Sequence, residues 1–157
     1  MSNVALRFMT VAVVAVALTA CGKNEETRTA AAAASAGTQK DVYGKEDAEC
    51  FAGIIRAADA KHFTPVDLGN WKNKLNSKDK DWLSGFYVAY SKATGVVETH
   101  LGRTPEELYK ADLITLQQLD MVKGYVDVFQ MKDAAKADSL SASACASIGF
   151  SKGTDLN

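Results

Sequence analysis

Apolar and polar residues follow one another along most of this chain with the spacing of amphipathic helices. From about residue 46 onward, apolar positions recur at steps of three and four, which places them on one helical face. Thr64-Pro65 and Thr104-Pro105 indicate two helix starts, because threonine caps the first turn and proline fits its first position. The expected helices span 46–60, 64–76, 77 or 79 to 101, 105–130 and 133–148.

The third of these helices has the clearest apolar stripe, and we expect it to supply the centre of the core. Gly102 is placed to end the helix in a left-handed conformation. Tyr87 falls off the stripe, so it is expected either to be exposed or to pack against another helix. The stripe comprises Leu83, Phe86, Tyr90, Ala93, Val97 and Leu101.

The segment 105–130 does not keep one apolar register, which predicts a break or kink near 110–112. Residues 124–129 alternate between apolar and polar, so a short strand is an alternative there, although both flanks are helical. Taken together, the pattern predicts an all-α bundle of four or five helices. The helical domain should occupy 45–150, and 151–157 should form a loose tail.

The N-terminal segment has a different character from the rest of the chain. Arg7 is followed by an apolar run over 8–18 and then by small residues. A helix of about 11 residues is only about 17 Å long and cannot cross the ~30 Å core of a bilayer. The pattern is typical of a secretory signal, which we place at residues 1–20. The polar and alanine-rich stretch 21–44 has little to bury and is expected to be a flexible tether.

Leu18-Thr19-Ala20-Cys21, at the end of the apolar run, resembles the lipobox of bacterial lipoproteins. The resemblance implies cleavage before Cys21, a thioether-linked diacylglycerol on its sulfur and an N-acyl chain on the new terminus. A thiol suits this step because the thiolate is a soft nucleophile. Gly22 resembles the sorting pattern of outer-membrane rather than inner-membrane lipoproteins. The implied location is a membrane anchor facing the periplasm.

Cys50 and Cys145 are the two cysteines that remain for the helical domain. An exported protein meets an oxidising compartment, so we expect these residues to form one disulfide that closes the bundle. Closing a loop of roughly 95 residues stabilises a fold by up to about 4.7 kcal/mol in the chain-entropy account. A redox-active or metal-binding pair is the alternative, although the chain has neither a C-x-x-C motif nor a histidine cluster nearby.

Charge and motif content favour neither nucleic-acid binding nor catalysis. The formal net charge is −1, and it becomes −2 when the signal with Arg7 is removed. His62 and His100 do not have metal-ligand spacing, and no G-x-S-x-G motif occurs. We therefore predict no catalytic residue, no metal site, no nucleic-acid partner and no cofactor apart from the lipid on Cys21.

One basic stretch is a candidate contact patch. It consists of Trp71, Lys72, Lys74, Lys78 and Lys80. These residues could meet anionic lipid head groups or a partner protein. The alternative is a solvated corner between two helices with core tryptophans, and the acids Asp79 and Asp81 dilute its charge.

The sequence thus predicts a non-catalytic, lipid-anchored envelope protein whose helical domain binds another envelope protein. Accessory, inhibitor or immunity, and chaperone-like roles all fit. The alternative is a lipoprotein that binds a small molecule or lipid between its helices, and an enzyme ranks third. A large apolar cavity would favour the ligand binder, whereas an exposed apolar patch would favour the protein partner.

Overall fold

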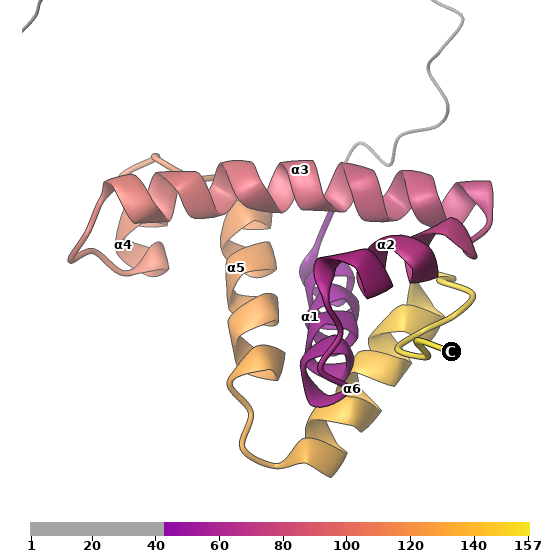
Figure 1. Cartoon of the computed structure of the whole chain (residues 1–157). Helices are drawn as coiled ribbons and strands as arrows, with labels where there is room; N and C mark the ends of the chain where they lie inside the picture. The colour runs from indigo at the N-terminus through magenta and orange to yellow at the C-terminus, as the bar shows by residue number, and fades with distance from the viewer. Residues whose placement is uncertain (1–42) are drawn as a thin grey trace, which may run out of the picture. The chain divides into compact units, whose positions relative to one another are not determined.

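The computed structural model of the chain describes residues 43–157, and within this range it is helical without any β-strand (Figure 1). The predicted all-α class is therefore confirmed, but the described part contains six helices instead of four or five. The helices are α1 (Lys45–Ala60), α2 (Pro65–Asn73), α3 (Ser77–Thr99), α4 (Pro105–Lys110), α5 (Leu116–Phe129) and α6 (Ala134–Ser147).

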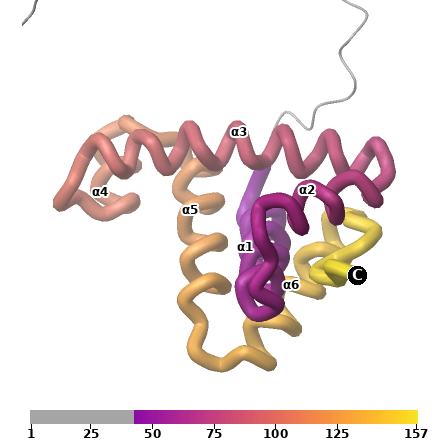
Figure 2. Tube along the Cα trace, in the orientation of Figure 1, coloured from indigo at the N-terminus to yellow at the C-terminus, as the bar shows by residue number. Residues whose placement is uncertain are grey.

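Helix α1 lies at the centre of the bundle, packed against α5 and α6 (Figures 1 and 2). The long helix α3 crosses the ends of α1 and α5, and the short helix α2 lies beside α3, to which the Lys72–Ser84 hydrogen bond joins it. Glycines allow the close contacts of α1. A Cβ atom at Gly124 of α5 would come within 2.8 Å of the Lys45 carbonyl oxygen, and one at Gly53 of α1 would overlap the side chain of Ser141 on α6.

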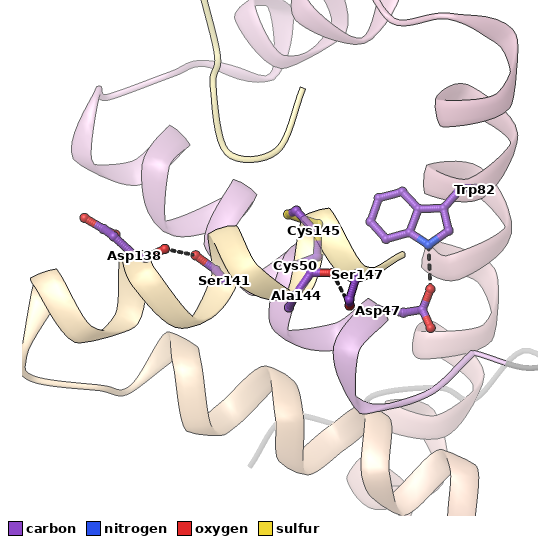
Figure 3. Close-up of a disulfide and its surroundings, with 8 residues drawn as sticks. All are labelled: Asp47, Cys50, Trp82, Asp138, Ser141, Ala144, Cys145 and Ser147. Atoms are coloured by element: carbon purple, nitrogen blue, oxygen red, sulfur yellow. Dashed lines mark hydrogen bonds between the residues drawn. A yellow bond between two sulfur atoms is a disulfide. The ribbon is translucent and has the colours of Figure 1, made fainter. Parts of the chain in front are cut away.

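The Cys50–Cys145 disulfide joins α1 to α6, which confirms the predicted pairing (Figure 3). Both cysteines are buried, their Cα atoms are 4.7 Å apart, and the bond closes a sequence separation of 95 residues. Gly53 and Ser141 face each other one turn away from the bond. The disulfide therefore holds α1 against α6 beside the point of closest helix contact.

The segment 105–130 is two helices, which confirms the predicted break near 110–112 and accounts for the additional element. Asp112 has a positive φ of 55°, so the chain turns out of the helical path after α4. Thr115 then starts α5 with a capping box: Gln118 N donates to its hydroxyl at 3.2 Å, and the Gln118 side chain accepts from its backbone N–H at 2.8 Å. Residues 124–129 are helical, so the strand alternative is wrong.

Leu101 does not belong to the core, although the stripe on α3 predicted that it would. Helix α3 ends at Thr99, and Leu101 is 90% exposed in the following turn. The helix stops early because His100 leaves the helical conformation, and its ring nitrogen Nδ1 lies 2.8 Å from the Val96 carbonyl oxygen. The other five members of the stripe lie in the core or pack against it.

The C-terminal residues 151–157 pack against α2 instead of forming a loose tail. The buried Trp71 indole donates a hydrogen bond of 2.9 Å to the Asp155 carbonyl oxygen, and Leu156 is only 4% exposed. Ser151 also donates to the buried carboxylate of Asp79 at the start of α3. The tail is ordered because it supplies an acceptor that the buried indole needs.

Several predictions concern residues outside the described range 43–157. These are the signal at 1–20, the lipid attachment at Cys21 and nearly all of the tether. Within 43–157, none of the helices combines the length and apolar character needed to cross a bilayer.

The close contact at Gly53 predicts a large effect of a single methyl group. Gly53→Ala should lower the free energy of unfolding by about 1–3 kcal/mol, because α1 and α6 must move apart to admit it. Gly95→Ala is the matched control: nothing lies within 4 Å of a Cβ there, so alanine should stabilise α3 by about 0.5–1 kcal/mol. Urea denaturation measures both variants. Equal stability of the two would contradict the packing described for α1 and α6.

Candidate binding groove

A groove lies between helices α1, α2 and α3, with a volume of about 430 Å³. Most of its lining is apolar. The residues that line it are Phe51, Ile54 and Ile55 of α1; Leu68, Gly69, Trp71 and Lys72 of α2; and Leu83, Ser84, Tyr87 and Val88 of α3.

The groove has a buried floor and an exposed rim. Its floor is α1, where Ile54 is 1% and Phe51 is 8% exposed. On the rim, Tyr87 and Val88 of α3 are 60% and 52% exposed. Of the two alternatives for Tyr87, the structure shows the exposed one. Two large side chains on adjacent positions of α3 are therefore available to contact another molecule.

Helix α2 forms the second wall, and local capping fixes where it begins. The Thr64 hydroxyl accepts from Asp67 N at 3.2 Å, while the Asp67 carboxylate accepts from Thr64 N at 2.8 Å and from its hydroxyl. The hydrogen bond from the Thr64 hydroxyl makes the largest contribution to lowering the pKa of Asp67, and the one from the Thr64 backbone N–H makes the next largest. Trp71 is the buried residue of α2, so this wall depends on one large side chain and on the C-terminal tail.

Gly69 lies in the middle of α2, where the fold gives no reason for a glycine. Nothing is within 4 Å of a Cβ built on it, and its φ is not positive. Glycine in a helix interior costs roughly 0.5–1 kcal/mol relative to alanine. Because Gly69 lines the groove, a side chain there would project into or beside the space that the groove leaves open. The glycine therefore widens the groove at the expense of helix stability.

Lys72 is the one charged residue that lines the groove in the described part of the chain. It is half-buried, and its Nζ donates a hydrogen bond of 2.9 Å to the Ser84 hydroxyl across the groove. The groove is consequently an apolar slot with a single positive charge, which is held between its two walls.

The structure separates the members of the predicted contact patch. Trp71 is 3% exposed, which agrees with the alternative of a solvated corner with core tryptophans, and its indole donates to the C-terminal tail. Lys74 and Lys78 are exposed and Lys80 is half-buried, but none of them lines the groove. Only Lys72 belongs to both the patch and the groove.

Aromatic side chains extend the apolar surface from the groove toward α5. The ring of Phe51 contacts those of Tyr90 and Tyr125, with centroids 6.2 and 6.0 Å away, and Tyr125 in turn stacks on the 40% exposed Phe129. Burial raises the pKa of Tyr90, with smaller contributions from Tyr125 and Glu98, and burial also raises the pKa of Tyr125. A tyrosine hydroxyl is neutral at physiological pH even at its usual pKa, and these shifts keep both hydroxyls neutral to still higher pH.

No other arrangement in the described residues suggests chemistry. Between residues 43 and 157 there is no group of three or more His, Cys, Asp or Glu side chains that could hold a metal ion. His62 lies in the turn after α1 with a positive φ of 53°, and His100 lies at the end of α3.

Sequence reasoning did not find the groove, although two signals pointed to it. Gly69 interrupts a short helix without ending it, and Tyr87-Val88 places two large side chains next to the core stripe of α3. Comparison of the chain with protein-family models, curated proteins and solved structures finds no match. The geometry of the groove is therefore the main guide to function.

The open space at Gly69 predicts that alanine will stabilise the protein there. Gly69→Ala should raise the free energy of unfolding by about 0.5–1 kcal/mol, because the methyl group meets nothing and α2 gains helix propensity. Thermal and urea unfolding measure the change. Destabilisation by this substitution would show that Gly69 has a packing role.

Proposed function

We propose that this protein is a non-catalytic lipoprotein of the bacterial cell envelope, anchored through lipid on Cys21, and that its helical domain binds another envelope protein. The observation that carries the proposal is the open apolar groove with Tyr87 and Val88 exposed on its rim. An accessory, inhibitor or immunity, or chaperone-like role would use such a surface.

The form of the groove favours a protein partner over an enzyme's substrate. Contiguous exposed apolar surface is costly to leave in water and is typical of interaction sites. Tyrosine is enriched among residues that dominate binding energy at interfaces, because it offers a large contact area with few rotatable bonds. Among residues 43–157, the lining of the groove beside Tyr87 includes a single charge, on Lys72, and no set of converging polar groups that could carry out a reaction.

The proposed anchor is compatible with this role. The lipobox resemblance implies an acylated Cys21, which lies 24 residues before Lys45 at the start of α1. By random-coil scaling, a segment of that length would span roughly 25 Å on average. The domain would thus stay close to the membrane, on its periplasmic side. Of the two membranes, the outer one is favoured, because Gly22 resembles the sorting pattern of outer-membrane lipoproteins. Anchoring of this kind raises the local concentration of the domain near partners in the same membrane.

A second candidate function is the binding of a small molecule or lipid. The volume of about 430 Å³ lies within the range of small-molecule sites, and the lining is apolar as such sites require. Native mass spectrometry of the protein extracted from its own membranes would detect a co-purifying ligand. A bound small molecule together with no captured protein would favour this function over the first.

The lipid anchor predicts a simple change in fractionation. Cys21→Ser should move the protein from the membrane pellet to the soluble periplasmic fraction, because the thioether cannot form on a hydroxyl. Fractionation followed by immunoblotting measures the distribution, and intact mass measures the loss of the acyl chains. A variant that stays membrane-bound like the wild type would exclude the lipobox interpretation.

The groove predicts where a partner can be captured. A photoreactive amino acid at Val88 on the rim should cross-link the full-length acylated protein to a specific envelope protein in intact membranes. The same group at Lys74, which is exposed outside the groove, should not. Gly69→Leu should abolish the cross-link by filling the groove, whereas Gly95→Leu, at an equally open helical glycine outside it, should preserve it. If the Gly69→Leu variant gave as much cross-linked product as the wild type, the result would contradict the proposed function.

A further inference from the structure

We infer that the segment of the partner that enters the groove is an amphipathic α-helix with an acidic residue that pairs with Lys72. This inference rests on the proposed function, in which the groove binds a protein, and it specifies the chemistry of that protein's contact segment.

The walls of the groove decide the secondary structure of the occupant. All three are helices, whose main-chain hydrogen bonds are already made internally, and residues 43–157 contain no strand. The groove therefore has no sheet edge to which an extended peptide could add. A backbone that enters an apolar slot without such an edge must satisfy its own N–H and C=O groups, since a buried polar group without a partner is costly. A helix does this.

Small residues on both walls give the helix room to approach. Gly69 of α2 lacks a side chain, and Ser84 of α3 has a short one. Packed helices lie about 8–10 Å apart, and the smallest distances require small residues at the contact. Ile54 and Ile55 on the floor and Leu83 beside them offer apolar surface to the buried face of the incoming helix.

The charge of Lys72 determines which helices fit. Its Nζ is held by the Ser84 hydroxyl, and no carboxylate lines the groove within the described residues. A partner aspartate or glutamate facing Lys72 would add an ion pair in a partly desolvated place, whereas a partner lysine there would be repelled. Such an ion pair contributes more to the orientation of the bound helix and to specificity for one partner than to binding affinity.

The open rim argues for a helix of a protein over a single acyl chain. Tyr87 and Val88 are more than half exposed, so a hydrocarbon chain in the groove would keep much of its own surface in water. An amphipathic helix instead turns a polar face outward and covers Tyr87 and Val88 with its flanks. A fatty acid remains a measurable alternative, because its carboxylate could also meet Lys72.

Three designed peptides test this inference on the full mature chain carrying Cys21→Ser, which removes the acyl chains. The peptides are identical amphipathic helices with Glu, Gln or Lys at one position beside the apolar face. Fluorescence anisotropy should show the Glu peptide binding about fivefold more tightly than the Lys peptide. Lys72→Glu should reverse this order, and Lys74→Glu, which changes the same charge outside the groove, should leave it unchanged. Gly69→Leu should weaken all three peptides at least tenfold.

Each other outcome overturns the inference. Absence of peptide binding, or binding with an order that Lys72→Glu does not change, would exclude a helix paired with Lys72. Tighter binding of oleate than of any peptide, with the same dependence on Lys72, would identify an acyl-chain site instead. Circular dichroism and the intact disulfide verify the fold of every variant. If no peptide binds but the cross-link at Val88 is still lost in Gly69→Leu, the proposed function is retained. Only the inference that the partner segment is a helix is then rejected.

Discussion

The close contact of α1 with α5 and α6 is the constraint on which the remaining structure depends. Gly124 and Gly53 let the two neighbouring helices approach α1 at van der Waals distance, and the Cys50–Cys145 bond fastens one of these contacts covalently (Figure 3). A 95-residue closure restricts the unfolded chain strongly, and in an exported protein the bond is stable. Helix α1 is thereby buried on two sides, and the side that faces α2 and α3 becomes the floor of the groove.

The two walls of the groove are held in different ways. Helix α3 buries Phe86 fully, and the Trp82 indole donates a hydrogen bond of 2.7 Å to the buried Asp47 carboxylate of α1. Helix α2 is shorter, and it depends on Trp71, whose indole is satisfied by the carbonyl of Asp155 in the C-terminal tail. The tail does not line the groove, but it holds the indole of Trp71 in place. Trp71 in turn holds α2, which is one wall of the groove. Of the two walls, α2 has the less extensive support and can adjust more easily to an occupant.

Local signals in the sequence were sufficient for the helices, whereas the groove depends on distant contacts. Thr64 and Thr104 predicted two helix starts correctly, because capping is decided within one turn. The disulfide followed from cysteine count and compartment. The early end of α3 that exposes Leu101 was missed, because the apolar spacing continues to that residue, whereas the loss of register near 110–112 correctly predicted the break before α5. Nothing local distinguishes Lys72 from its neighbouring lysines; only the placement of α2 beside α3 puts it in the groove.

The groove is also one of the places where the sequence departs from what stability alone would select. Gly69 weakens a short helix without relieving any clash, and Val88 leaves a large apolar side chain in water. Departures of this kind are expected at functional sites, since natural sequences otherwise agree locally with their fold. An apolar slot alone would accept many amphipathic segments. In the proposed interaction, Lys72 is the single charge that residues 43–157 contribute to the lining, and it would favour one orientation and one class of partner over the others.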